Sequence, residues 1–407
     1  MKEEKKLVPK RRFKEFVWEW KKIDLGSIGS TFSGLSGKTK NDFGHGTAEF
    51  VTYMNIFNNT ISDINVTEKV VRDDKQTQLE YGDILFTTSS ETPNEVGMSS
   101  VWLDKRPNVY LNSFCFGFRP TIKFDYYYIG YMLRANSFRK QMEILAQGIS
   151  RYNISKAKVL ETVVLLPSVQ EQQKIGEFFK VLDERIANQE RKIAKVKALK
   201  SAYLTEMFPQ DGELVPKRRF KGFEGEWKNG MLGDFGTVEM NKRIFKWQTS
   251  SAGDVPFYKI GTFGQKADAF ISYDIFNEYK LKYPYPNIGD ILISASGSIG
   301  RTVVYNGEDA YFQDSNIVWL KHDGKLNNLF LKQFYKIVKW NGLEGSTIQR
   351  LYNKDILETQ INIPPTYEEQ QKIGEFFKNL DDQIITEDKK LEKLKKMKEA
   401  YLEEMFV

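Results

Sequence analysis

The sequence has little cysteine and histidine and no long apolar run. Its 407 residues include one cysteine, Cys115, and two histidines, His45 and His322. One cysteine excludes a disulfide framework and fits a reducing compartment. Zinc sites and Ser-His-Asp centres need more of these side chains together, so we expect no metal site and no catalytic residue. The apolar runs, such as residues 162–166, are too short to cross a membrane, and the N-terminal MKEEKKLVPKRRF lacks the apolar stretch of a secretory signal. These absences favour a cytoplasmic protein with no membrane partner.

A nucleotide-binding loop is also not supported. The stretch SGLSGKTK at residues 33–40 contains part of a phosphate-binding pattern, but the pattern needs a glycine where Phe32 stands. Asp83 and Asp290 recur in the word GDIL, which a Gly-Asp turn before a strand explains without catalysis. The formal charge of +6 mildly favours an acidic partner.

The chain contains a duplicated unit. The word EQQKIGEFF occurs at residues 171–179 and again at residues 369–377. LVPKRRFKEFVWEWK at residues 7–21 matches LVPKRRFKGFEGEWK at residues 214–228 in twelve of fifteen positions. YGDILFTTSS and IGDILISASG, and SAYLTEMF and EAYLEEMF, follow in the same order in the two halves. A period near 200 residues indicates a duplicated domain and not a solenoid.

Similarity between the halves is uneven. The terminal arms and the segments after the nine-letter word are nearly identical, whereas the two bodies share only a skeleton of Gly, Asp and apolar positions. We therefore expect the arms and the segments after the nine-letter word to have the same function in both halves, and the two bodies to have related but different functions. The predicted boundaries are an N-terminal arm at 1–21, a first body at 22–166, a central helix at 167–208, a linker and repeated arm at 209–228, a second body at 229–364 and a C-terminal helix at 365–407.

The bodies have the pattern of mixed α and β structure. DILFTT, DILISA, YLNSFCFGFRP and YFQDSNIVWL are typical of buried or half-buried strands. Residues 125–146 and 326–340 have helical spacing. The predicted fold class is α+β, with two tandem pseudo-repeated α/β domains.

The two repeated segments after the bodies have the pattern of a coiled coil. Apolar residues recur at steps of four and three over about 36 residues, or roughly 54 Å of helix. The alternative is an ordinary amphipathic helix on a globular core, but such helices average only about 11–12 residues. We expect the two helices to pair antiparallel as a rod between the bodies. The predicted seam residues are Ile175, Phe179, Leu182, Ile186, Ile193, Val196, Ile373, Phe377, Leu380, Ile384, Leu391 and Leu394.

The order of body, helix, body and helix resembles the specificity (S) subunit of bacterial type I restriction–modification systems. The resemblance rests on EQQKIGEFF, the GDIL turn and the Leu-Asp pair after the nine-letter word, each present twice in register, and it covers essentially the whole chain. It implies two target recognition domains, each of which reads half of an asymmetric, interrupted site in double-stranded DNA, with the helices as the spacer. It further implies two modification subunits that use S-adenosylmethionine and two restriction subunits that use ATP with Mg. The S subunit itself would bind no cofactor and have no active site.

An alternative function is a protein-binding adaptor whose duplicated coiled coil holds two partners.

DNA binding by the bodies would need particular side chains. Phosphates are bound by Lys, Arg and small hydroxyl donors, and base edges are read best by Arg, Lys, Asn and Gln. Three polar loops in each body carry such side chains. The candidate DNA-binding residues are Ser36, Lys38, Thr39, Lys40, Thr88, Ser89, Ser90, Asn94, Arg151, Tyr152 and Asn153 in the first body, and Lys242, Arg243, Lys246, Ser296, Ser298, Arg301, Gln349, Arg350, Tyr352 and Asn353 in the second.

Overall fold

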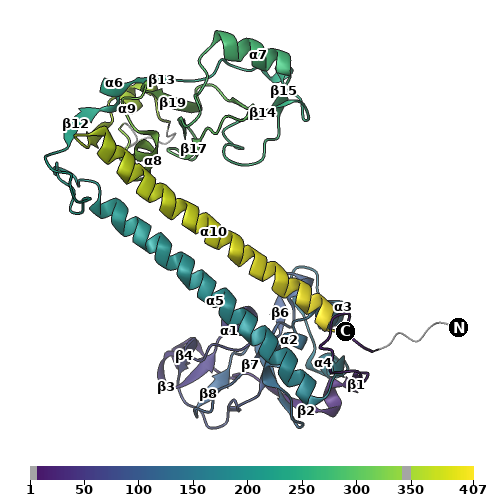
Figure 1. The fold of residues 1–407 in the computed structure, drawn as a ribbon. Coiled ribbons are helices and arrows are strands. Elements are labelled where there is room, and N and C mark those ends of the chain that lie inside the picture. The colour runs from purple at the N-terminus through teal and green to yellow at the C-terminus, as the bar shows by residue number, and fades with distance from the viewer. Residues whose placement is uncertain (1–6, 342–349) are drawn as a thin grey trace. The chain divides into compact units, whose positions relative to one another are not determined.

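A computed structural model describes residues 7–341 and 350–407 (Figure 1). The chain divides into two compact units. The first consists of the chain up to Glu190 together with Lys389–Val407, and the second is Arg191–Asp388. The last part of the C-terminal helix therefore belongs to the same unit as the N-terminal half of the sequence.

The first unit contains two larger sheets beside two strand pairs. The four-stranded antiparallel sheet has the order β2 (Gly29–Ser33), β9 (Cys115–Pro120), β5 (Ile84–Thr87), β7 (Ser99–Val101). The three-stranded sheet has the order β4 (Thr67–Val70), β3 (Phe43–Val51), β8 (Val109–Leu111), and β3 runs parallel to β8. The pairs are β1 (Lys21–Asp24) with β11 (Val163–Leu166) and β6 (Ser89–Ser90) with β10 (Tyr152–Asn153). The helices are η1 (Leu25–Ser27), η2 (Lys40–Asp42), η3 (Pro93–Glu95), α1 (Tyr53–Asn58), α2 (Tyr126–Met132), α3 (Asn136–Leu145) and α4 (Lys156–Leu160).

The second unit repeats this strand order although its sequence has diverged. Its four-stranded sheet is β13 (Thr237–Glu239), β19 (Ile317–Lys321), β16 (Ile291–Ser294), β17 (Thr302–Val304). Its three-stranded sheet is β15 (Phe270–Ile271), β14 (Val255–Tyr258), β18 (Tyr311–Phe312), and β12 (Lys228–Met231) pairs with β20 (Gln360–Ile363). The helices are η4 (Lys246–Gln248), α6 (Leu232–Phe235), α7 (Tyr273–Lys282), α8 (Asn328–Ile337) and α9 (Asn353–Leu357). The mixed α/β fold of two repeated domains is confirmed.

The GDIL word forms the same turn in both units. Gly82 and Gly289 each have φ of 95°, which a residue with a Cβ rarely adopts. The Asp83 carboxylate accepts from the Glu80 N–H at 2.7 Å, and the Asp290 carboxylate accepts from the Asn287 N–H at 2.8 Å. These aspartates therefore close turns before β5 and β16.

The structure differs from the sequence pattern in two details. The helical residues 125–146 form two helices, because Ala135 between them is extended, with φ of −69° and ψ of 152°. The half-buried Arg134 before it directs its guanidinium to backbone carbonyls. That guanidinium donates to Ile56 O at 2.7 Å and Asn59 O at 2.9 Å at the end of α1, and burial lowers its pKa to about 10. YLNSFCFGFRP and YFQDSNIVWL are each two strands in different sheets, since a polar turn lies between β8 and β9 and between β18 and β19.

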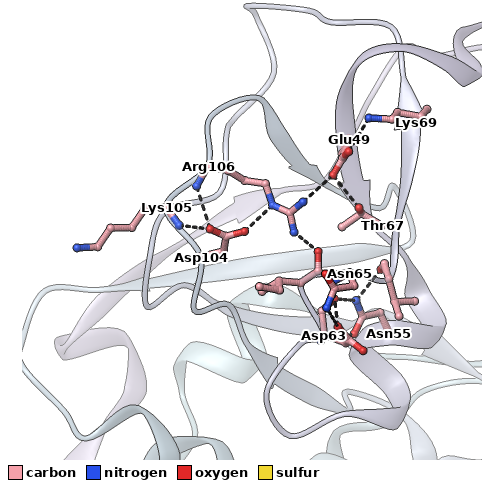
Figure 2. Close-up of polar contacts among 11 residues, drawn as sticks. Glu49, Asn55, Asp63, Asn65, Thr67, Lys69, Asp104, Lys105 and Arg106 are labelled. Atoms are coloured by element: carbon pink, nitrogen blue, oxygen red, sulfur yellow. Dashed lines mark hydrogen bonds and ion pairs between the residues drawn. The ribbon is translucent and has the colours of Figure 1, made fainter.

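A polar network joins the strands of the three-stranded sheet in the first unit (Figure 2). The Arg106 guanidinium lies between two carboxylates, 2.5 Å from Asp104 and 3.0 Å from Glu49. Glu49 on β3 also accepts from Thr67 at 2.7 Å and from Lys69 at 2.6 Å on β4. These donors, Lys69 first, lower the pKa of Glu49. The network therefore fixes β3, β4 and the chain before β8 together.

Helices α5 (Val169–Glu206) and α10 (Tyr367–Met405) have 38 and 39 residues and pack antiparallel, as expected (Figure 1). In the first unit, the start of α5 meets the end of α10, and the ring centroids of Phe178 and Tyr401 lie 5.0 Å apart. In the second unit, the end of α5 meets the start of α10, and Tyr203 lies 5.0 Å from Phe376. The same contact is thus made twice with the helices exchanged.

The seam residues lie inward along these helices. The buried ones are Ile175, Phe179, Leu182, Ile193, Val196, Ile373, Phe377 and Leu380, and the half-buried ones are Ile186, Ile384, Leu391 and Leu394. Phe179 and Phe377 also join the cores of the first and second body, so each helix is anchored in a body at its start.

Candidate nucleic-acid interface

In the first body, two of the three polar loops are joined by a short strand pair. Ser89 and Ser90 pair with Asn153 and Tyr152, and the Ile154 N–H donates to Thr88 O at 2.9 Å. The Arg151 guanidinium donates to the Ser89 hydroxyl at 2.9 Å. Residues some sixty positions apart in the sequence therefore form one surface at the end of β5.

These loops meet the turn between β8 and β9, residues 111–115, which we call the first hub. The Thr88 N–H donates to Phe114 O at 3.0 Å, and Arg151 lies 5.8 Å from the Phe114 ring centroid. The third loop follows β2 and joins the same turn, because the Leu35 N–H donates to Leu111 O at 2.8 Å. All three predicted loops of the first body thus converge on the first hub.

The second body has the same convergence on residues 313–317, the second hub. The Ala295 N–H donates to Asn316 O at 2.8 Å, and the Ser296 hydroxyl donates to the Asn316 side chain at 2.8 Å. Arg350 Nη2 donates to Ser315 O at 2.7 Å. The loop at 241–246 is attached through Arg243, whose guanidinium lies 4.0 Å from the Asp314 carboxylate.

The hubs correspond residue by residue although their side chains differ. Thr88 and Ala295 make the same backbone bond, to Phe114 and Asn316 respectively. Ser89 pairs with Asn153 where Ser296 pairs with Arg350. One frame therefore presents an exposed phenyl ring and an amide in the first body, and an amide and a guanidinium in the second.

The candidate DNA-binding residues differ in exposure. The exposed ones are Ser36, Thr39, Lys40, Asn94, Arg151, Asn153, Lys242, Arg243, Lys246, Ser298, Arg301, Tyr352 and Asn353. The half-buried ones are Lys38, Thr88, Ser90, Tyr152, Ser296 and Arg350; Ser89 is buried, and Gln349 lies outside the described residues.

Several of these residues hold the loops and do not face outward. The Ser89 hydroxyl is occupied by Arg151. The Lys38 ammonium lies 3.0 Å from the Asp73 carboxylate and, as its main hydrogen-bond partner, lowers the pKa of Asp73 to about 2. Asn94 is held by α3 and not by the hub, since Arg139 Nη2 donates to its carbonyl at 3.0 Å.

The hub residues were missed by the sequence reasoning. Phe114, with 57% of its surface exposed, and residues 314–316 lie inside stretches interpreted as strands. Ser315 has φ of 53°, which is uncommon for a residue other than glycine. The sequence does contain a turn signal at both hubs. Asn-Ser at 112–113 and Asp-Ser-Asn at 314–316 are turn-forming residues that interrupt the apolar pattern.

A second duplicated surface lies where each arm meets the helices. The Arg12 guanidinium donates to the Glu171 carboxylate at 2.7 Å, and Arg219 donates to Glu369 at 2.6 Å. Both carboxylates are buried at the start of the nine-letter word. Each pair is a charge-assisted, two-pronged contact that fixes an arm to a helix.

Aromatic and cationic contacts complete the two arm surfaces identically. Phe13 packs edge-on against Phe178, and Phe220 packs edge-on against Phe376. The Arg11 guanidinium lies 5.1 Å from the Tyr401 ring centroid, and the Arg218 guanidinium lies 5.1 Å from the Tyr203 ring centroid. The chain therefore carries two near-identical surfaces.

Among the residues that the structure describes, no three His, Cys, Asp or Glu side chains are grouped as metal ligands would be. Within the same residues, none of the helices has both the length and the apolar character needed to span a membrane.

Comparison with known proteins places the chain in a family. The family model described as "Type I restriction modification DNA specificity domain" matches residues 18–198 and 224–396. These matches cover most of the chain, and the chain belongs to this family.

Individual relatives agree with this assignment. A putative type I restriction enzyme specificity subunit, S.HindORF215P from Haemophilus influenzae, is 60% identical over 144 residues, which are 35% of this chain and 37% of that protein. The match thus spans little more than a third of that relative's length. The crystal structure of a type I system S subunit from M. genitalium has a TM-score of 0.61 at 17% identity, over 98% of this chain and 99% of that one. A structure described under complex assembly and conformational transition of the type I system has a TM-score of 0.57 at 19% identity, over 94% and 96%. These two structures share the fold.

Proposed function

We propose that this protein is the sequence-specific DNA-recognition subunit of a type I restriction–modification complex. The first body, residues 22–166, reads one half of an asymmetric bipartite site in duplex DNA, and the second body, residues 229–364, reads the other half. The observation that carries the proposal is the pair of hubs, in which one backbone frame presents different polar and aromatic side chains. Two half-sites of different sequence require such a difference.

The side chains at the hubs suit base reading. Arg350 in the second body and Asn153 in the first occupy equivalent positions, and Arg favours guanine whereas Asn favours adenine in the major groove. The exposed lysines and arginines of the neighbouring loops, Lys40, Lys242 and Lys246 among them, suit phosphate contacts, which position a protein on DNA without reading its sequence.

The arm surfaces support a second part of the proposal. Two near-identical surfaces suit two copies of one partner, and we assign them to two modification subunits that use S-adenosylmethionine to methylate adenine. Two restriction subunits, which use ATP with Mg, would complete the cytoplasmic complex. This chain supplies recognition and no catalytic residue.

The test is to map methylated adenines genome-wide in cells that express this chain with its modification subunit. We expect one interrupted, asymmetric motif. Replacing residues 22–166 by the body of a relative should change one half of that motif and leave the other unaltered. A motif whose halves both change would contradict the assignment of one body to one half-site. Absence of any motif that depends on this chain would contradict the proposed function.

A further inference from the structure

The second body carries an exposed pair of aromatic side chains beside its hub. Phe245 and Trp247 are 50% and 81% exposed, and their rings are nearly parallel, with 6° between the planes and 6.4 Å between the centroids. Large aromatic side chains bury much apolar surface on contact. An exposed pair of them on one loop therefore indicates a binding site.

Hydrogen bonds within the loop that carries Phe245 and Trp247 hold the two rings in their exposed positions. The Phe245 N–H donates to the Gln248 side-chain oxygen at 2.9 Å, and the Gln248 N–H returns a bond to Phe245 O at 2.9 Å. The Thr249 hydroxyl donates to Lys246 O at 2.8 Å. Ile244 is buried in the core of the three-stranded sheet. The turn therefore holds both rings outward in a set geometry.

The surroundings of the rings are cationic. Lys242, Arg243 and Lys246 are all exposed on the same short loop, and Arg243 lies 5.9 Å from the Phe245 centroid. Arg243 also faces Asp314 of the second hub, so the aromatic pair adjoins the surface proposed to read bases. A polyanion with planar apolar groups, that is, a nucleic acid, fits both the charge and the rings.

We propose that Phe245 and Trp247 form an aromatic wedge that stacks on a base of duplex DNA in the half-site of the second body. Proteins that bend DNA insert apolar side chains between base steps, and base–aromatic stacking tolerates any sequence because each base has a planar face. This inference rests on the proposed function and adds a contact that does not depend on hydrogen bonds to base edges.

The first body lacks this pair at the equivalent turn. There η2 begins after Thr39, whose N–H donates to the Asp42 carboxylate at 2.7 Å, as the Phe245 N–H donates to Gln248. By this correspondence Thr39 stands in place of Phe245, and Asn41 stands in place of Trp247. The wedge therefore acts in one half-site only.

The experiment uses the full chain with its modification subunits and a duplex that contains the mapped site. Trp247→Ala should weaken binding by about tenfold, since stacking on an aromatic side chain contributes about 1–3 kcal/mol per base. Phe245→Ala should weaken binding less. Tyr273→Ala is the matched control, because Tyr273 is an aromatic side chain of the same body that is 47% exposed on α7, outside the three polar loops, and its loss should leave DNA affinity within twofold.

A second measurement reports the contact directly. Stacking on a base quenches tryptophan emission, so DNA should quench wild type more than Trp247→Phe, and the difference should be absent with a scrambled duplex. A duplex that carries 5-iodouracil at single thymine positions should photocrosslink to residue 245 or 247 only from the half-site of the second body.

The outcomes separate the two proposals. If wild type binds its site and Trp247→Ala binds within twofold of it, the wedge is wrong and the proposed function stands. If the modification subunit alone quenches Trp247, the pair is a protein contact and the wedge is wrong. If wild type prefers no sequence over a scrambled duplex, both proposals fail.

Discussion

The Lys398 ammonium on α10 lies 2.6 Å from the Asp183 carboxylate on α5. The repeat contains the same contact with the helices exchanged, because Lys200 on α5 pairs with Asp381 on α10. Lys200 and Lys398 stand at equivalent positions of the repeated helices, three residues before Tyr203 and Tyr401. Each pairs with the aspartate of the Leu-Asp word on the other helix, and the two pairs fix the register of the antiparallel helices.

Asp381 and Asp183 differ in the lysines that lose a charge partner when the carboxylate is removed. Asp381 is approached by Lys200, by Lys336 at 3.4 Å and by Lys332 at 3.6 Å. Asp381→Asn should lower the free energy of unfolding by about 3 kcal/mol, because it leaves the buried Lys200 without its charge partner.

Asp183→Asn is the matched change in the first unit. Asp183 accepts from the Tyr131 hydroxyl at 2.7 Å and from Lys398, which is partly exposed. Its loss should cost about 1 kcal/mol, as for exposed ion pairs. Urea denaturation of both variants checks the order, and an equal effect of the two would contradict the role assigned to the lysine cluster.

The apolar seam can be tested by burying a charge in it. Leu182 and Leu380 are 5% and 9% exposed, so Leu182→Asp with Leu380→Asp should separate the helices at a cost of several kcal/mol. We expect loss of copurification with the modification subunits. Leu199→Asp is the control, because Leu199 is 45% exposed on α5. Normal assembly of the double variant would contradict the seam.

The lowered pKa of Lys336 predicts that the free energy of unfolding depends on pH. Burial first, and then the neighbouring Lys200, lower the pKa of Lys336 to about 8 from its ordinary value of 10.5. Between pH 8 and 10.5 the unfolded chain therefore binds more protons at this site than the folded chain, and stability should rise with pH over that window. Below pH 8 Lys336 is charged in both states, and the full penalty of its partial desolvation is present.

Lys336→Met keeps the apolar stem and removes that charge. It should raise the melting temperature at pH 7 and abolish this contribution to the rise between pH 8 and 10.5, seen as the difference between wild-type and variant melting curves. Lys332→Met is the control at 3.6 Å from the same carboxylate. A wild-type curve that stays parallel to the Lys336→Met curve over this window would exclude Lys336 as the titrating group.

Arg350 tests the second hub. Arg350→Ala should relax the specificity of one half-site only, by about 1–3 kcal/mol at one base pair, the worth of a good bidentate contact. Arg350→Lys keeps the charge but loses the planar fork, and should retain overall affinity better than the discrimination. Mapping methylated adenines with both variants checks this, and relaxation of the half-site read by the first body would be inconsistent with the assignment.

The sequence alone determined the features that depend on local periodicity and on repetition. The 3.5-residue spacing defined α5 and α10 over their whole length, and the duplicated words defined the order of arm, body and helix and the family. The apolar period of a coiled coil and a repeated stretch of sequence can both be recognised along the chain. Neither requires knowing which distant residues are in contact.

Tertiary structure decided where the three polar loops of each body come together. Thr88 and Phe114, or Ala295 and Asn316, are joined by backbone hydrogen bonds that have no side-chain signature. The contacts of Arg134 are of the same kind, because its guanidinium donates to carbonyls at the end of α1, more than seventy positions earlier in the sequence. Such contacts depend on strand order and burial across the whole body, and the local pattern of the chain does not encode them.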